Sequence, residues 1–326
     1  MSPYFHPFAV APMMDRTNRH CRFFHRQLTA RALLYSEMVT ADAVIHGDRL
    51  RLLGFSGEER PLALQLGGSD PAKLALAARI GEDFGYGEIN LNVGCPSDRV
   101  RSGAFGACLM LEPTLVGECV ASMAEKVSLP VTVKCRLGVD DQDEAALDRL
   151  TDAVVAAGAG AIWVHARKAW LSGLSPKENR EIPPLDYARV HRLKRRFPDV
   201  FIGLNGGLKD LDIAAAELAN VDAVMLGRAA YDEPALLAEV DRRFYGARAD
   251  TDLLAALDSM RAYVERELSK GERLVSLVKP MLGLFSGRPG ARAWRRVLSV
   301  GAAKRGAGAE LIFEALAEVL PLSVAA

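Results

Sequence analysis

Cys95 is the side chain of this sequence with the clearest potential for acid–base chemistry. It lies in the run Asn92-Val93-Gly94-Cys95-Pro96-Ser97. A thiol has an ordinary pKa of about 8.5, so near neutral pH it is mostly protonated and can donate a proton to a nascent carbanion. Two alternatives stay open at this level. A lone cysteine is more often an inert apolar residue, and Cys108 offers the same chemistry.

Two glycine-containing segments, Asn205-Gly206-Gly207 and Gly227-Arg228, indicate a phosphate site. Glycine lets backbone N–H groups approach an anion closely, and Arg228 would add positive charge. The alternative is a pair of tight turns that need a positive φ angle. We favour the phosphate site because both segments follow the last two strands predicted below.

Basic side chains also end two apolar segments. Lys134 follows Val131-Thr132-Val133, and a buried lysine needs an anionic partner because burying it unpaired costs free energy. A phosphate or a reduced flavin ring would serve, and so would a salt bridge with Glu37. His165 and Arg167 fit either phosphate ligands or satisfied residues at the rim of the site.

A repeated pattern of a short apolar strand followed by a helical stretch would position these side chains. It fits a closed (β/α)8 barrel, an α/β fold of about 250 residues that has its active site at the C-terminal ends of the strands. An open doubly wound sheet is the alternative, but no Gly-x-Gly-x-x-Gly follows an early strand. The expected strands are Phe8–Ala11, Ala32–Tyr35, Leu62–Leu66, Glu88–Leu91, Val131–Lys134, Ala161–Val164, Phe201–Leu204 and Ala223–Leu226. Helices are expected over 72–84 and from Glu112 toward Val127.

The pattern changes after Arg248. Asp250-Thr251-Asp252 predicts the start of a helix with apolar residues on one face, which ends near Gly271. Further helical patterns cover 275–285, 291–300 and 309–319, and no strand pattern returns. We therefore expect a barrel domain over 1–249 and an all-helical domain over 250–326.

The composition excludes several classes of protein. With 41 basic and 41 acidic residues the formal net charge is zero, which excludes a globally basic nucleic-acid binder but not a local basic patch. The five cysteines show no metal-ligand spacing, and no His-Glu-x-x-His occurs, so we expect no metal. The chain also lacks a signal-peptide pattern and a membrane-spanning apolar run. We therefore expect a cytoplasmic protein with reduced thiols and no membrane association.

Longer segments go beyond these single motifs. Among them are Ala11-Pro12-Met13-Met14-Asp15-Arg16-Thr17, Ala63-Leu64-Gln65-Leu66-Gly67-Gly68-Ser69-Asp70-Pro71, Val164-His165-Ala166-Arg167-Lys168-Ala169-Trp170, and the runs 33–40, 88–97 and 174–184. On these segments the chain resembles the bacterial tRNA-dihydrouridine synthases, and most closely their A branch, over essentially its whole length.

The resemblance implies an FMN-dependent barrel with a helical tRNA-binding domain, which uses NADPH to reduce D-loop uridines, U20 and U20a in the A branch, to 5,6-dihydrouridine. Hydride would pass from flavin N5 to uracil C6, and Cys95, rather than Cys108, would protonate C5. Tightly bound protein partners are not implied, and we expect a monomer. The implied FMN contacts are Pro12, Met13, Met14, Gln65, Lys134, His165, Asn205, Gly206, Gly207, Gly227 and Arg228. The implied tRNA contacts are Asn92, Lys177, Arg180, Arg292 and Arg295.

An uneven charge distribution agrees with an RNA substrate. Between Arg273 and Ala309 there are eight basic residues and no acidic one. Arg292, Arg295 and Arg296 would share one helical face. Phosphate binding is one interpretation, and a solvated charged face is the other.

Three alternatives to a tRNA-modifying enzyme remain. An FMN barrel reductase of a small molecule would not need the basic helical segment. A sugar-phosphate barrel enzyme would bind no flavin. An RNA-binding protein without catalysis would not depend on Cys95.

Overall fold

The computed structural model describes residues 6–97 and 105–319. The chain divides into two compact units, one of Met1–Met14 with Leu33–Gly227 and one of Asp15–Ala32 with Arg228–Ala326. The second unit thus includes two segments that lie outside the helical domain expected over 250–326. The expected domain boundary itself stays a prediction.

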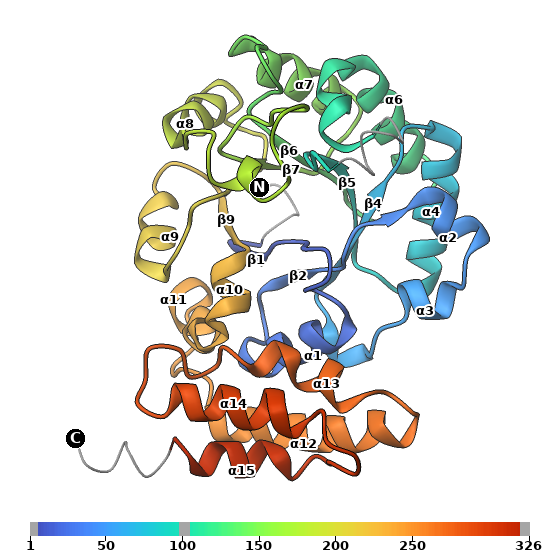
Figure 1. The fold of residues 1–326 in the computed structure, drawn as a ribbon. Coiled ribbons are helices and arrows are strands. Elements are labelled where there is room, and N and C mark those ends of the chain that lie inside the picture. The colour runs from blue at the N-terminus through green and yellow to red at the C-terminus, as the bar shows by residue number, and fades with distance from the viewer. Residues whose placement is uncertain (1–5, 98–104, 320–326) are drawn as a thin grey trace. The chain divides into compact units, whose positions relative to one another are not determined.

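The first unit is a closed barrel of eight parallel strands, as Figure 1 shows. The ring runs in the order β2-β1-β9-β8-β7-β6-β5-β4, and pairing between β2 and β4 closes it. All eight expected strands are present, which confirms the (β/α)8 prediction. A short further strand, β3 (Val39–Thr40), pairs with β4 outside the ring and was not predicted. The ring strands are β1 (Phe8–Val10), β2 (Leu33–Tyr35), β4 (Leu62–Gly67), β5 (Glu88–Val93), β6 (Val131–Arg136), β7 (Ala161–His165), β8 (Ile202–Asn205) and β9 (Ala223–Leu226).

The centre of the barrel is filled by alternating small and large side chains. Ala9, Ala63 and Ala161 belong to the same buried cluster as Tyr35 and Trp163. Gly203 makes room for the largest of these side chains, because a Cβ atom there would lie 2.2 Å from the Trp163 ring. The interior is therefore a packed core and not a channel.

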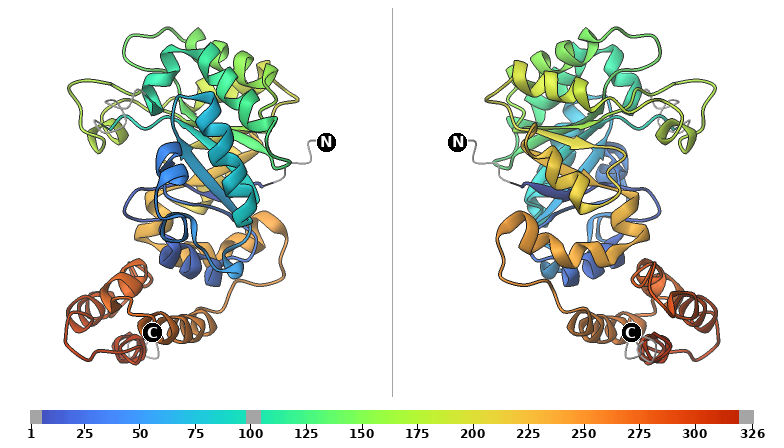
Figure 2. Two further views of the ribbon diagram at one scale, coloured as in Figure 1. Left: turned by 90° about the vertical axis from the view of Figure 1, so that its right-hand side faces the viewer. Right: turned by 90° about the vertical axis from the view of Figure 1, so that its left-hand side faces the viewer.

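Helices surround the ring of strands in Figure 1. The cyan helix α4 lies alongside the strands in the left view of Figure 2 and packs on β4 and β5. Helix α4 begins at Pro71, one residue before the expected range, with the Asp70 side chain accepting from two backbone N–H groups, and it ends as predicted before Gly85, where φ is +89°. The helices of this unit are α2 (Ala41–His46), α3 (Arg49–Leu53), α4 (Pro71–Phe84), α6 (Pro113–Ala124), α7 (Ala145–Ala156), α8 (Tyr187–Arg196) and α9 (Leu211–Glu217).

Helices make up the second unit within the described part of the chain. One expectation was wrong: no single helix covers 275–285, because the α-helix ends at Val278 and a 3-10 turn, Lys279–Met281, follows it. Pro280 lacks the N–H group that a continuing helix needs. The α-helices are α1 (Arg19–Leu28), α10 (Arg228–Asp232), α11 (Val240–Tyr245), α12 (Leu253–Ser269), α13 (Leu274–Val278), α14 (Ala291–Gly301) and α15 (Leu311–Ala317). Over residues 6–97 and 105–319, no helix has the length and apolarity needed to span a bilayer.

Candidate active site

Polar side chains concentrate on two neighbouring strands of the barrel. Strand β5 carries Asn90 and Asn92 at alternate positions, and β6 carries Lys134 and Arg136 in the same way. Alternate residues of a strand share one face. The register pairs Asn92 with Lys134, so the two polar rows lie side by side toward the C-terminal end of the barrel.

The Cys95 loop begins where β5 ends, and Asn92 holds it. The Asn92 side-chain oxygen accepts hydrogen bonds of 3.0 Å from the backbone N–H groups of Gly94 and Cys95. The Cys95 thiol is partly exposed and lies 3.5 Å from the Ser97 hydroxyl. Cys108 lies further along the same connection, in a 3-10 helix over Gly106–Leu111. The thiol of Cys95 is therefore at the end of the barrel where a proton donor is expected.

Lys134 has no carboxylate partner in the described part of the chain. Its Nζ donates to the side-chain oxygen of Asn205 at 2.9 Å, so the alternative salt bridge with Glu37 is not formed. Burial, followed by the positive charge of Arg136, lowers the pKa of Lys134 to about 8. A cation held only by a neutral amide would gain from an anionic ligand.

His165 lies among several cations at the same end of the barrel. Burial is the largest cause that lowers its pKa well below the ordinary value, and the charges of Arg136, Lys134, Arg167 and Arg180 add to it. Its Nδ1 atom is buried and has no hydrogen-bond partner within residues 6–97 and 105–319. A neutral imidazole with one unused nitrogen is therefore available to a ligand in a positively charged environment.

The two glycine segments differ in their backbone. Gly206 and Gly207 have φ angles of +102° and +70°, and a Cβ on Gly206 would lie 2.8 Å from the His165 ring. Gly227 does not have a positive φ. The turn interpretation therefore holds for Gly206 and Gly207, where it is compatible with an anion site, and not for Gly227. Arg228 is exposed at the start of α10 in the second unit, and its role in a phosphate site stays a prediction.

The remaining predicted cofactor contacts also lie at strand ends. Pro12, Met13 and Met14 follow β1 after Ala11, and Met14 is 50% exposed. Gln65 is buried on β4, and its amide lies between Asn90 and Asn92, with a hydrogen bond of 2.8 Å to each. These residues share the C-terminal end of the barrel with Lys134.

The segment between β7 and α8 carries two of the predicted tRNA contacts, Lys177 and Arg180, which are both exposed. Asn179 between them is fully buried and exchanges hydrogen bonds with the backbone of Trp170 at 2.7 and 2.9 Å. Arg136 donates to the backbone oxygen of Asn179 at 2.9 Å. These hydrogen bonds anchor the segment to the barrel.

In the second unit, all eight basic residues between Arg273 and Ala309 are exposed. None forms an ion pair with a carboxylate in the part of the chain that the structure describes. Arg292, Arg295 and Arg296 lie on α14, whose Trp294 is buried. This face therefore carries positive charge without neutralisation.

Some buried polar residues were given no role from the sequence. They are Asn179 and, nearer than Asn92 to the N-terminal end of the barrel, Glu88, Asn90 and Thr132. The alternation Glu88-x-Asn90-x-Asn92 was a signal, because period-two polarity places all three on one face of a strand. Asn179 offered no comparable pattern.

The profile of the "Dihydrouridine synthase (Dus)" family matches residues 9–319. The chain belongs to the dihydrouridine synthase family. This confirms the resemblance found in the sequence. The family is flavin-dependent, and its members are oxidoreductases that act on tRNA uridine.

Similar proteins of this family come from several bacteria. A "tRNA-dihydrouridine(20/20a) synthase" of Xanthomonas axonopodis pv. citri (strain 306) is 57% identical over 309 residues, which is 94% of this chain and 92% of that protein. Proteins of the same name from Salmonella typhi and Escherichia coli (strain K12) are 56% and 55% identical, over 95% of this chain and 94% and 90% of their own lengths.

Among solved structures, a 2-naphthoyl-CoA reductase in complex with 2-naphthoyl-CoA matches with a TM-score of 0.55 at 12% identity. The match covers 72% of this chain and 49% of that chain. At this identity the likeness concerns the fold alone.

The residues at the C-terminal end of the barrel fit the flavin of this dihydrouridine synthase family. Lys134 lacks a carboxylate, and the buried Nδ1 of His165 lacks a partner within the described ranges. Gly206 and Gly207 have positive φ angles and no side chain, so their backbone N–H groups are open to an anion.

Proposed function

We propose that this protein is an FMN-dependent tRNA-dihydrouridine synthase that uses NADPH and reduces the C5–C6 double bond of D-loop uridines U20 and U20a. The observation that carries the proposal is the joint occurrence of the Cys95 thiol and an unneutralised Lys134 at the C-terminal end of a family-typical barrel. Relatives at 55–57% identity that are named for positions 20 and 20a support this choice of uridines.

FMN would be held by residues at the strand ends. Lys134 and the neutral His165 would face its polar groups, and the Asn205-Gly206-Gly207 segment would receive the phosphate, with Gly227 and Arg228 contributing. The remaining contacts with FMN would come from Pro12, Met13, Met14 and Gln65. When bound, the flavin supplies the hydride that adds to C6 of the uracil ring.

Cys95 would complete the reduction. Hydride addition at C6 leaves negative charge at C5, and the thiol would donate its proton there as general acid. The hydrogen bonds that the backbone N–H groups of Gly94 and Cys95 donate to Asn92 would fix the position of the loop, and with it the Cys95 thiol, at the end of strand β5. Lys134 would stabilise negative charge in the site through its own positive charge.

The tRNA would contact exposed basic residues of both units: Lys177 and Arg180 beside the barrel mouth, and Arg292 and Arg295 on α14, with Asn92 at the target base. Most of the affinity would come from phosphate contacts. The uneven placement of charge would then allow a chain of zero net charge to bind RNA.

An anaerobic titration tests the proposal. The purified protein is reduced with NADPH, tRNA from cells that lack dihydrouridine is added, and the flavin absorption band is followed. We expect reoxidation by this tRNA and not by fully modified tRNA. A protein that is yellow as purified but whose flavin stays reduced after the tRNA is added would point to a reductase of a small molecule. A protein that is colourless as purified would exclude FMN.

A further inference from the structure

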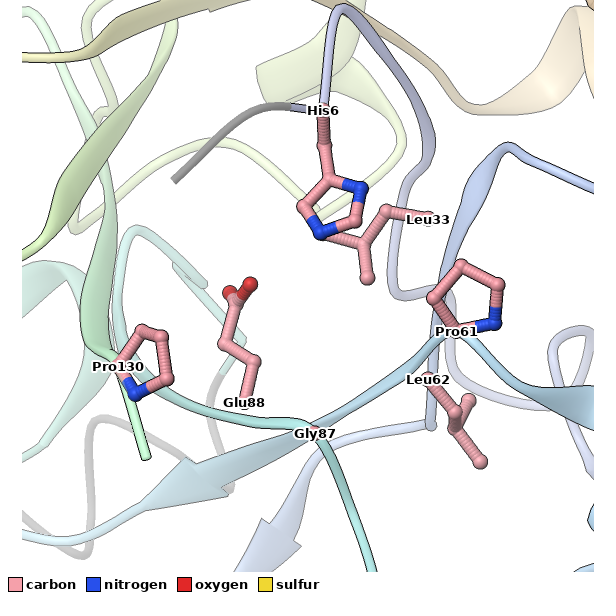
Figure 3. A pocket seen from close by; sticks show the side chains of 7 residues that line it. All are labelled: His6, Leu33, Pro61, Leu62, Gly87, Glu88 and Pro130. Carbon is pink, nitrogen blue, oxygen red and sulfur yellow. The ribbon is translucent and has the colours of Figure 1, made fainter. Parts of the chain in front are cut away.

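A buried carboxylate lies at the end of the barrel opposite to the Cys95 loop. Glu88 is 2% exposed, and its Oε1 accepts hydrogen bonds from the hydroxyl groups of Tyr35 and Thr132. Figure 3 shows Glu88 pointing into a cavity of about 100 Å³. That volume is too small for a nucleotide, so the cavity is not a cofactor site. Its lining residues are His6, Leu33, Pro61, Leu62, Gly87, Glu88 and Pro130.

A chain of side-chain hydrogen bonds runs from this carboxylate through the barrel core. The Asn90 amide donates to the Thr132 hydroxyl at 2.8 Å. Gln65 donates to the oxygen of Asn90, and Asn92 donates to the oxygen of Gln65, both at 2.8 Å. Each link crosses between neighbouring strands. The chain therefore joins the N-terminal end of the barrel strands to the C-terminal end, where Cys95 lies.

The two ends of the chain leave only one direction for its hydrogen bonds. Backbone N–H groups can only donate, so the atom of Asn92 that faces Gly94 and Cys95 must be its oxygen. The Asn92 nitrogen must then face Gln65, whose oxygen accepts.

The same logic continues to the other end. Because the Gln65 oxygen is used, its nitrogen donates to Asn90, and Asn90 in turn donates to Thr132. The Thr132 hydroxyl accepts from Asn90 and uses its own O–H group to donate a hydrogen bond to Oε1 of Glu88. The Oε1 atom of Glu88 accepts this hydrogen bond, as it also accepts one from the Tyr35 hydroxyl.

We infer that Glu88 is a positioning residue that acts on the active site through this chain. Its effect is to reinforce, from the opposite end of the chain, the orientation in which the nitrogens of Gln65 and Asn92 are donors and which the backbone N–H groups of Gly94 and Cys95 require. Each of these two nitrogens keeps one N–H group that forms no hydrogen bond within residues 6–97 and 105–319. The site therefore offers N–H donors to a ligand that carries carbonyl acceptors, such as a flavin pyrimidine ring or a uracil. The nature of this ligand rests on the proposed function, whereas the direction of the chain does not.

The test compares three substitutions in the two hydroxyl residues that donate to Oε1 of Glu88. Thr132→Val has nearly the same shape and cuts the chain between Asn90 and Glu88. Thr132→Ser keeps the hydroxyl group. Tyr35→Phe removes the other hydroxyl that donates to Glu88 but leaves the chain intact. If Thr132→Val does not fold, Thr132→Ala replaces it with the same expectation.

The first readout needs no cofactor. In ¹⁵N-labelled protein without flavin, we expect Thr132→Val to shift the side-chain amide resonances of Gln65 and Asn92 and the backbone amide of Cys95. Thr132→Ser and Tyr35→Phe should leave these resonances close to those of the unchanged protein. Equal shifts in Thr132→Val and Tyr35→Phe would show a general loss of packing and overturn the inference, and so would the absence of shifts.

The second readout is the dissociation constant of FMN, measured by quenching of flavin fluorescence. Thr132→Val should weaken binding about fivefold, the worth of one neutral hydrogen bond, while Thr132→Ser and Tyr35→Phe should not. Unchanged FMN affinity in Thr132→Val would refute the role of the chain in the site. If the unchanged protein binds no flavin, the proposed function fails, and the resonance shifts still decide whether the chain exists.

Discussion

Lys134 on strand β6 donates a hydrogen bond of 2.9 Å to the side-chain oxygen of Asn205 at the end of strand β8. In turn, the Asn205 nitrogen donates to the backbone oxygen of Met225 on β9 at 2.6 Å. The lysine is thus held in place across three strands by neutral groups, and its charge is left without compensation by the described part of the protein.

This arrangement predicts that Lys134 destabilises the ligand-free protein. Its pKa is about 8 in the folded state against 10.5 ordinarily, so between these pH values the unfolded chain binds more protons and stability rises with pH. We expect flavin-free Lys134→Met to be more stable at pH 7 by about 2 kcal/mol, after allowance for the lost hydrogen bond. Urea denaturation at pH 7 and pH 10 measures this. A difference in stability that does not shrink at the higher pH would contradict the prediction.

His165 should remain neutral when the folded protein is acidified. Its pKa lies well below 6.5 because of burial and the surrounding cations. The unfolded chain takes up a proton there as the pH falls, so His165 contributes a loss of stability on the acid side. We expect no titration of its imidazole by NMR between pH 7.5 and 5.5. The same ring in urea-unfolded protein should titrate near 6.5, and titration in the folded state would refute the assignment.

Replacement of Cys95 should abolish reduction of tRNA and leave binding intact. Loss of a general acid lowers rates by about 10²–10⁴-fold, so we expect Cys95→Ala to show at least a hundredfold slower reoxidation by tRNA in a single anaerobic turnover. Cys108→Ala, in the same connection, is the matched control and should keep the rate. Loss of rate in Cys108→Ala alone would transfer the role to that residue.

The basic face of α14 should act through RNA phosphates. We expect Arg292→Ala and Arg295→Ala to weaken tRNA binding and to reduce the salt dependence, each lowering the slope of log K against log[salt] by about 1. Arg149→Ala is the control, because Arg149 is exposed but paired with Asp143 at 2.8 Å. Fluorescence anisotropy with labelled tRNA measures both quantities. Equal losses in all three variants would indicate a general charge effect.

Gly206 should tolerate no side chain. Its φ of +102° disfavours any other residue, and a Cβ atom would lie 2.8 Å from the His165 ring. We expect Gly206→Ala to lower the free energy of unfolding by about 2 kcal/mol. Gly57 has no atom within 4 Å of the position of a Cβ, so Gly57→Ala should change stability by less than about 0.5 kcal/mol. Thermal unfolding of both variants compares them, and similar melting temperatures would contradict the steric argument.

The sequence was sufficient to predict the barrel because most of its strands are short apolar segments followed by turn residues, while β5 and β6 keep apolar residues at alternate positions. Short element β3 was not predicted, since two residues such as Val39–Thr40 carry no periodicity. The break of the helix after Val278 depends on Pro280, whose effect was overlooked.

Within the site, residue types and positions were predictable, but their partners were not. The sequence could place Lys134 at a strand end, yet both Glu37 and an anion were acceptable partners for it. Only the register of β6, β7 and β8 determines that Asn205 comes within hydrogen-bond distance. The contacts made by Asn179 have the same origin, because they join residues whose approach depends on the folded path of a loop.

The buried Asn179 also has a consequence for the affinity of the protein. Its side chain forms hydrogen bonds with the backbone of Trp170 and Leu174, and its backbone oxygen accepts a hydrogen bond from Arg136 on β6. The segment that presents Lys177 and Arg180 therefore loses its conformational freedom during folding and not during encounter with an RNA. A partner that docks on this preorganised segment therefore pays little conformational entropy to order it, and more of the contact energy is available as affinity.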